Sequence, residues 1–138
     1  MTDPHESEQH KPLPLATPTS QPFWAALQDD RIELQYCSGC EAYVFYPRSH
    51  CPGCLSSELE WRAVSGRGHI HSFTVARVPT APLFADEVPQ LLAIVELDES
   101  PRLTSTIVDS LLNEVVIGAT VEPMFDHVAS DVTLLRYR

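Results

Sequence analysis

The sequence predicts a mainly β protein with one short helix near its N-terminus. Six segments after residue 58 are rich in β-branched and aromatic residues and are separated by Pro, Gly, Asp and Ser, as short strands are. They are LEWRAVS, GHIHSFTVARV, QLLAIVELDE, RLTSTIVD, ATVEPMFDHV and DVTLLRYR. Because helices do not alternate with them, they favour a small antiparallel barrel or sandwich, with one helical turn at SLLNEVV. The apolar run LLAIVEL predicts a central strand covered on both faces.

Residues 21–35 are expected to form an N-terminal helix that ends near Asp30. Thr19 or Ser20 can cap this helix, and Pro22 suits its first turn. Three large apolar side chains then share one face at three-to-four spacing: Phe23, Trp24 and Leu27.

Residues 36–62 predict a zinc ribbon. All four cysteines lie in two Cys-x-x-Cys pairs separated by ten residues: Cys37, Cys40, Cys51 and Cys54. A tight turn aims two sulfurs at one point, so two turns supply the tetrahedral shell that Zn²⁺ prefers. Gly39 and Gly53 occupy the third position of each turn, where a left-handed backbone is often required. A shell of four thiolates leaves no position for water, so one structural Zn²⁺ per chain is expected.

Three other interpretations of the cysteines stay open. An iron site of rubredoxin type uses the same four sulfurs. Two disulfides would need an oxidising compartment. A redox pair of thioredoxin type is usually found within a βαβ pattern, which is absent here. His50, next to Cys51, could replace one ligand, although four cysteines already complete the shell.

Charge and composition restrict the partners and the location. Residues 1–20 are polar and proline-rich, which predicts a disordered tail without the features of a signal peptide. No apolar run approaches the roughly 20 residues of a membrane span, and the reducing cytoplasm is the expected location. The net charge is -10, and from residue 66 onward five Arg face ten Asp and Glu. Such a surface disfavours the second function considered, an OB-fold protein that binds nucleic acid.

The remaining polar residues do not predict a self-sufficient enzyme. His69 and His71 alternate along one strand and could act together as a base or as two ligands of a metal. Two histidines that simply lie on the half-exposed face of a strand are the more common explanation. His127 has no obvious partner in the sequence. Three carboxylates look like a solvated strand end: Glu96, Asp98 and Glu99. A nucleophile elbow and a glycine-rich phosphate loop are both absent.

An ordered series of motifs resembles one known family. FWAAL is followed by LQYCSGCEAYVFYPRSHCPGC, LEWRAVSGRGHIHSFTVARVP, LLAIVELDE and IGATVEPMF. This order, with Pro47-Arg48 before the second cysteine pair and with Gly66 and Gly68 after Trp61, is similar to the acyl-CoA-associated zinc-ribbon/OB-fold proteins, catalogued as "domain of unknown function 35". The chain departs from the pattern at Glu41, where many members carry a third glycine.

The resemblance implies a fold and a function. The fold is an N-terminal helix, a rubredoxin-like ribbon and a five-stranded OB barrel over 63–138. The function is that of a non-catalytic subunit of a thiolase-superfamily enzyme that handles acyl-CoA thioesters, so no catalytic residue is expected here. A retro-aldolase of steroid side-chain degradation is favoured as the partner, with a thiolase or C-acyltransferase as the alternative. A partner dimer carrying two copies of this chain, a heterotetramer, is expected.

The surface that meets the partner or the acyl-CoA is expected at four residues. The segment VPTAPLFADEVP, residues 78–89, is long for a hairpin loop and carries Leu83 and Phe84. These two residues either anchor the partner or fold back onto the barrel. Arg48 and Arg67 are candidates for contact with a CoA phosphate or a partner carboxylate.

Overall fold

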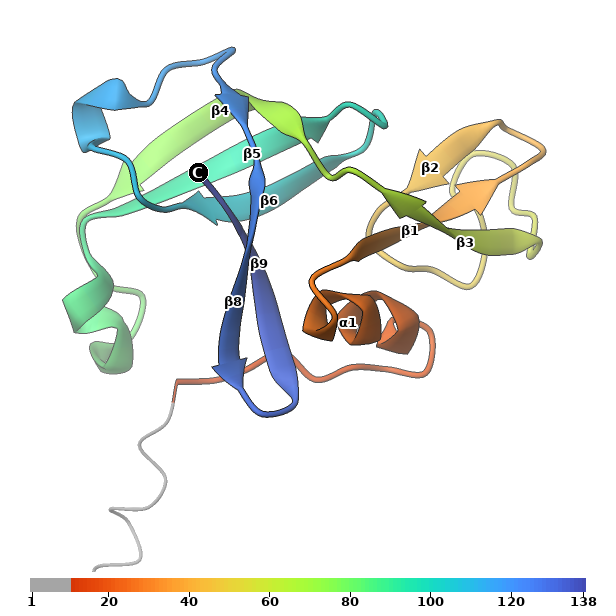
Figure 1. The fold of residues 1–138 in the computed structure, drawn as a ribbon, viewed down its shortest axis with the longest axis horizontal. Coiled ribbons are helices and arrows are strands. Elements are labelled where there is room, and N and C mark those ends of the chain that lie inside the picture. Colours follow the sequence, from red (N-terminus) through yellow and green to blue (C-terminus); the bar gives the residue numbers. More distant parts are fainter. Residues whose placement is uncertain (1–10) are drawn as a thin grey trace, which may run out of the picture.

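A computed structural model describes residues 11–138 as two β-sheets and one α-helix (Figure 1). The smaller sheet is the ribbon, with the strand order β2-β1-β3. The larger sheet is the barrel, with the order β7-β4-β5-β6-β9-β8. The elements are α1 (Gln21–Gln28), β1 (Ile32–Cys37), β2 (Ala42–Val44), β3 (Leu59–Val64), β4 (Gly68–Ala76), η2 (Pro82–Glu87), β5 (Gln90–Leu97), β6 (Arg102–Ile107), η3 (Leu112–Glu114), β7 (Thr120–Val121), β8 (Pro123–Ala129) and β9 (Val132–Tyr137).

Helix α1 begins after Ser20, with Pro22 in its first turn. It ends at Gln28 because Asp30 adopts a left-handed backbone (φ 55°), and the N–H of Asp29 bonds back to the carbonyl of Ala26. Strand β1 starts only two residues after Asp30, so the segment 21–35 holds both the helix and the beginning of the ribbon. The helix buries Phe23, Ala26 and Leu27.

The barrel is nearly closed by one interrupted strand. Strand β7 pairs with β4, while β8 follows after Glu122 and pairs with β9, so residues 120–129 connect the two edges of the sheet. On the other side, β6 and β9 run parallel and meet at the pair Ile107–Tyr137. The Ser105 hydroxyl donates to the Leu135 carbonyl at 2.8 Å and adds a link across this junction. The expected mainly β fold, with a helix, a ribbon and an OB barrel, is confirmed.

Two sequence-based expectations about the strands need correction. The segment 59–65 is a strand, but it belongs to the ribbon sheet and pairs with β1, which leaves five longer strands and the short β7 in the barrel. Strand β5 lies between β4 and β6 but is covered on one face only, because Ile94 is 37% exposed. The run LLAIVEL therefore reflects β propensity as much as burial.

Helix, ribbon and barrel share one hydrophobic core. Phe23 and Leu27 of α1 and Ile32 and Leu34 of β1 pack in the same cluster as the barrel side chains. The tip of the ribbon has a separate small cluster of Cys37, Val44 and Cys51, with Leu59 against it. The ribbon is therefore fixed to the barrel at its base, while its tip depends on other contacts.

The first ten residues of the predicted disordered tail lie outside the described residues. Within residues 11–20, Lys11 lies 3.3 Å from a carboxylate oxygen of Glu87 and 5.8 Å from the ring centre of Phe84. Ser20 is buried and its hydroxyl accepts a hydrogen bond from the N–H of Thr17. Across residues 11–138, no helix is long and apolar enough to cross a membrane.

Candidate metal centre and surface sites

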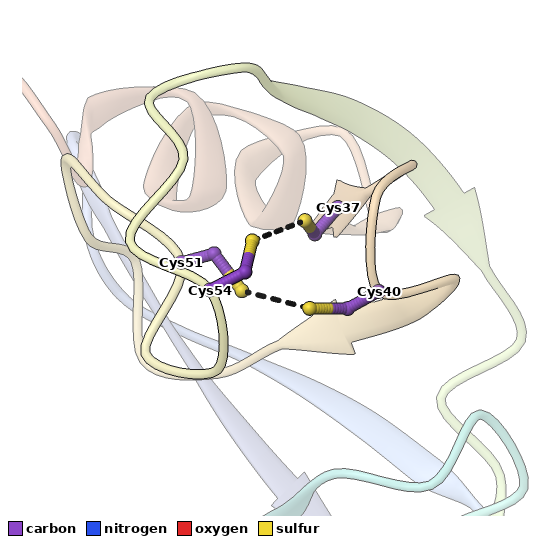
Figure 2. A group of neighbouring side chains, drawn as sticks. All are labelled: Cys37, Cys40, Cys51 and Cys54. Atoms are coloured by element: carbon purple, nitrogen blue, oxygen red, sulfur yellow. Dashed lines mark hydrogen bonds between the residues drawn. The ribbon is translucent and has the colours of Figure 1, made fainter.

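The four cysteine side chains converge from two loops at the ribbon tip (Figure 2). Cys37 ends β1 and Cys40 precedes β2, while Cys51 and Cys54 lie on the loop that leads to β3. The ligand atoms all lie within 4.8 Å of one another. Cys37 and Cys51 are buried and the other two are exposed, so one side of the cluster faces solvent.

The sulfur positions fit a tetrahedral metal. A regular tetrahedron with metal–sulfur bonds of about 2.3 Å has edges of about 3.8 Å. The Sγ atoms of Cys37 and Cys54 are 3.6 Å apart, and those of Cys40 and Cys51 are 3.8 Å apart. These separations are much longer than a disulfide bond of about 2.05 Å. The cysteines are therefore free thiols placed to bind a metal.

The glycines of the two turns have a different role from the one expected. The left-handed residues are Glu41 (φ 53°) and Leu55 (φ 63°), one position after each pair, and not Gly39 or Gly53. A Cβ at Gly53 would lie 3.3 Å from the Sγ of Cys40, and one at Gly39 would lie 3.8 Å from the Sγ of Cys37. Gly53 therefore keeps space open beside the Cys40 sulfur, whereas a side chain at Gly39 would make an ordinary van der Waals contact with the cluster.

The hydrogen-bonding environment shifts the pKa values of two cysteine thiols in opposite directions. Backbone N–H groups of Cys54 and Gly53 donate to the sulfur of Cys51 and lower the pKa of its thiol to about 7. Interactions with the neighbouring thiols of Cys54 and Cys51 raise the pKa of Cys40 to about 12. Four thiolates this close together need a cation to offset their mutual repulsion, which Zn²⁺ would supply.

The junction between ribbon and barrel contains structural residues that the sequence did not reveal. Gly66 is left-handed (φ 68°), and a Cβ there would lie 2.1 Å from a methyl carbon of Ile32. The buried Tyr137 hydroxyl donates to the Gly66 carbonyl at 2.6 Å. One carboxylate oxygen of Glu99 accepts from the Ser65 hydroxyl at 2.9 Å and the other from the Gly66 N–H at 3.3 Å. Glu99 therefore holds the junction and does not simply face solvent.

The histidines do not join the cysteines or form a catalytic cluster among residues 11–138. His50 is exposed, with its Nδ1 3.0 Å from the Ser49 hydroxyl. A β-bulge between Ile70 and Ser72 interrupts the expected alternation of His69 and His71. His71 is exposed, and its Nδ1 lies 3.7 Å from a carboxylate oxygen of Glu96, which also accepts from Arg102 at 3.0 Å.

His127 has two partners that the sequence did not suggest. Its Nε2 lies 2.7 Å from the Oδ1 of Asp30, and its Nδ1 lies 2.7 Å from the buried Thr133 hydroxyl. The Thr133 side chain is almost inaccessible (1% exposed), so its hydroxyl cannot reach a substrate. The chain Asp30–His127–Thr133 ties the end of α1 to the β8–β9 hairpin.

The four expected contact residues lie on separate surfaces. Arg48 is exposed on the ribbon, where its backbone is fixed by two hydrogen bonds to the buried Gln35 side chain. Arg67 lines a depression of about 690 Å³ on the barrel. Phe84 is partly buried beneath Lys11, whereas Leu83 is exposed. The larger exposed apolar surface is on residues 111–117, which sequence reasoning treated only as a helical turn.

Comparisons with known proteins match both parts of the chain. A sequence model described as "ChsH2, rubredoxin-like zinc ribbon domain" matches residues 24–60, and one described as "ChsH2, C-terminal OB-fold domain" matches residues 61–126. A "DUF35 domain-containing scaffold protein" of Methanothermobacter thermautotrophicus is 41% identical over 96 residues, which cover 69% of this chain and 71% of that protein. A "Probable enoyl-CoA hydratase alpha subunit" of Thermomonospora curvata is 31% identical over 121 residues, or 84% of this chain but 37% of that protein.

Two solved structures are also similar. One, titled "Ltp2-ChsH2(DUF35) aldolase", superposes with a TM-score of 0.79 at 28% identity and covers 91% of this chain and 97% of the matched chain. The other is a protein of unknown function of the DUF35 family from Sulfolobus solfataricus, with a TM-score of 0.58 at 17% identity over 86% of this chain and 84% of that one. The second similarity concerns the fold alone.

Proposed function

Because this chain belongs to the ChsH2-type DUF35 family of zinc-ribbon and OB-fold scaffold proteins, we propose that it is a non-catalytic subunit of a thiolase-superfamily enzyme that acts on acyl-CoA thioesters. The main support is the structural similarity to the ChsH2 chain of an aldolase, which extends over 97% of that chain. The absence of a catalytic cluster among residues 11–138 fits a subunit that acts by assembly.

The favoured partner is a retro-aldolase that shortens a steroid side chain held as a CoA thioester. A thiolase or C-acyltransferase partner is the alternative. The proposed assembly is an enzyme dimer with one copy of this chain on each subunit. Arg48, Arg67, Leu83 and Phe84 are proposed contacts with the enzyme or the acyl-CoA.

Cys37, Cys40, Cys51 and Cys54 are the proposed ligands of one structural Zn²⁺. Zinc has no redox chemistry at such a site and supplies folding free energy to the ribbon. Its four protein ligands leave no open position, so the metal would take no part in the reaction of the complex.

Co-expression tests the assembly. Each thiolase-superfamily enzyme of the source organism would be co-expressed with this chain, which would carry an affinity tag, and analysed by size-exclusion chromatography with light scattering. We expect one enzyme to be retained as a heterotetramer. Failure of all of them to bind would contradict the proposed function.

Activity measurements on the same samples identify the reaction. The retained enzyme should cleave a steroid-CoA β-hydroxy thioester more efficiently with this chain than without it, and the isolated chain should show no turnover. Carbon–carbon bond formation between two acyl thioesters, without retro-aldol cleavage, would favour the thiolase or acyltransferase alternative.

A further inference from the structure

Residues 108–118, the apolar loop, join β6 to β7 and expose several aliphatic side chains. The exposed fractions are 65% for Leu111, 36% for Leu112, 56% for Val116 and 69% for Ile117. The loop, light blue in Figure 1, lies at the end of the barrel away from the ribbon. A cluster of large aliphatic side chains in one short loop is unusual for a surface that only faces water.

The apolar loop is held in one shape by its own backbone. The Leu111 N–H donates to the Glu114 carboxylate at 3.2 Å, and the Glu114 N–H donates to the Leu111 carbonyl at 3.0 Å. Val115 points inward and is only 7% exposed. A hydrogen bond fixes each end of the loop. The Val108 N–H donates to the Tyr137 carbonyl at 2.7 Å, and the Gly118 N–H donates to the Ile70 carbonyl at 2.8 Å. A preformed loop loses little conformational entropy on binding. Little of the favourable free energy of its apolar contacts would therefore be offset by the cost of ordering the loop.

A depression next to the loop can receive a partner side chain. It has a volume of about 450 Å³, and its lining includes Val108, Ser110 and Leu112 of the loop together with Glu87 and Pro89. The segment with Leu83 lies just before Glu87. The apolar loop and Glu87, the last residue of η2, therefore border the same hollow.

The charges around the loop indicate which partner fits. Three arginines, Arg67, Arg136 and Arg138, are accompanied by a larger group of acidic residues: Glu87, Asp98, Asp109, Glu114, Glu122 and Asp126. Glu122 accepts from the Nε of Arg138 at 2.9 Å, so this arginine is already paired. A second copy of this chain would bring the same acidic residues together, and phosphates of nucleic acid or of an anionic membrane would be repelled.

We infer that the apolar loop is the main anchor for the enzyme subunit, and that the enzyme offers it an apolar groove bordered by Lys and Arg. This inference rests on the proposed function and specifies the surface through which it is performed. Leu111 and Ile117 are the central contacts, and Asp109 belongs to the polar border.

The test uses the full chain and the enzyme retained in the co-expression experiment. Leu111→Asp and Ile117→Asp, made singly, should each weaken binding about 30-fold or more, as loss of a central contact does. The added negative charge suits a basic border, so a loss of affinity reports the apolar contact. Leu15→Asp is the matched control, because Leu15 is 89% exposed and lies outside the loop. It should bind within about twofold of the unsubstituted chain, as expected for a residue outside the interface.

Asp109→Asn tests the charge border. Asp109 has a left-handed backbone (φ 57°), which asparagine also tolerates, so the loop should keep its shape. We expect a several-fold slower association at low salt and a weaker dependence of the association rate on ionic strength. An unchanged salt dependence would contradict a basic partner surface.

Other outcomes overturn the inference in distinguishable ways. If Leu111→Asp and Ile117→Asp melt like the unsubstituted chain and bind like Leu15→Asp, the loop is not the anchor while the proposed function stands. If Leu111→Asp disturbs the turn, Ile117→Asp alone decides. A dimer of the isolated chain that Ile117→Asp dissociates would mean that a second copy covers the loop. Binding to phosphatidylcholine–phosphatidylserine vesicles that Ile117→Asp abolishes would mean a membrane contact. If no enzyme binds the unsubstituted chain, the proposed function fails first.

Discussion

The left-handed residues after each cysteine pair show how the ribbon accommodates its cluster. Glu41 and Leu55 have φ values of 53° and 63°, where a Cβ atom is unfavourable. Neighbouring hydrogen bonds hold the backbone in this unfavourable conformation. One of them is donated by the Leu55 N–H to the Cys51 carbonyl at 2.8 Å. The resemblance described in the sequence analysis leads one to expect glycine at position 41, and glycine would adopt this backbone conformation without a Cβ contact.

Glu41→Gly should therefore stabilise the protein. Glycine removes the Cβ contact in the left-handed region, and we expect a gain of about 1 kcal/mol in the free energy of unfolding, less the entropy that glycine adds to the unfolded chain. Urea denaturation at a fixed zinc concentration measures this gain. Glu41→Ala is the control, because it removes the same charge but keeps the Cβ. Equal stability of the two variants would assign the effect to charge instead of backbone strain.

Tyr137 makes the stability depend on alkaline pH. Burial, with a smaller effect of the Glu99 carboxylate, raises the pKa of its phenol above the usual value of 10.0. The folded protein holds this proton more tightly than the unfolded chain, so the contribution is complete below about pH 10 and falls as pH rises further, by up to about 1.4 kcal/mol per pH unit.

Tyr137→Phe should cost about 1–3 kcal/mol near neutral pH, because the buried Gly66 carbonyl loses its hydrogen-bond donor. The difference between the two proteins should shrink above pH 10, where only the unsubstituted chain has this phenol to ionise. Urea denaturation from pH 8 to pH 11.5 measures both effects. A difference that stays constant over this range would contradict the raised pKa of Tyr137.

At the scale of elements, the ribbon tip and the barrel differ in what stabilises them. The tip has a small cluster of two cysteines and Val44, whereas the barrel core includes side chains from α1 and from most strands. A cluster of this size buries too little apolar surface to offset the entropy of ordering two loops. The folded structure of the ribbon tip should therefore depend on the metal, whereas that of the barrel should not.

Zinc removal tests this difference. Metal analysis should give close to one zinc per chain with little iron. After chelation, amide hydrogen exchange should accelerate in residues 38–58 while strands β4, β5 and β6 stay protected. Cys54→Ser should reproduce this pattern because it removes one of the four ligands, and Ser49→Ala on the same loop should not. Unchanged exchange in the tip of a metal-free protein would contradict the proposed structural role of zinc.

The sequence predicted local elements better than their long-range arrangement. The six strand segments and the convergence of the cysteines followed from side-chain type and spacing. The strand at Ile32–Cys37 was missed because it depends on distant residues: it pairs with β2 and β3, and Ile32 and Leu34 are buried in the core shared with the barrel. The exposure of Ile117 was missed because an aliphatic residue normally predicts burial. The contacts of Glu99 and His127 join residues 33 and 97 positions apart, and sequence spacing gives no signal at such distances.

At the scale of the whole molecule, the shared core fixes the ribbon relative to the barrel. The ribbon and the apolar loop then lie at opposite ends of the molecule (Figure 1). The net charge of -10 gives this body an acidic surface, and four thiolates with one Zn²⁺ would make it about -12. An acidic body of this kind would favour a partner whose contact surface is basic, in line with the proposed role as a subunit of a larger enzyme.

His69 and His71 both lie on strand β4 and are the candidates for proton transfer named in the sequence analysis. His69→Asn combined with His71→Asn should lower the activity of the assembled complex less than about tenfold, against the roughly 10²–10⁴ expected for a general base. The β-bulge and the exposed position of His71 leave the pair without a shared target. Turnover would be measured at saturating concentrations of the variant chain, with affinity measured separately, so that weaker assembly is not mistaken for lost chemistry. A loss of a hundredfold in a complex that is fully assembled would place a proton-transferring group on this chain and contradict its non-catalytic role.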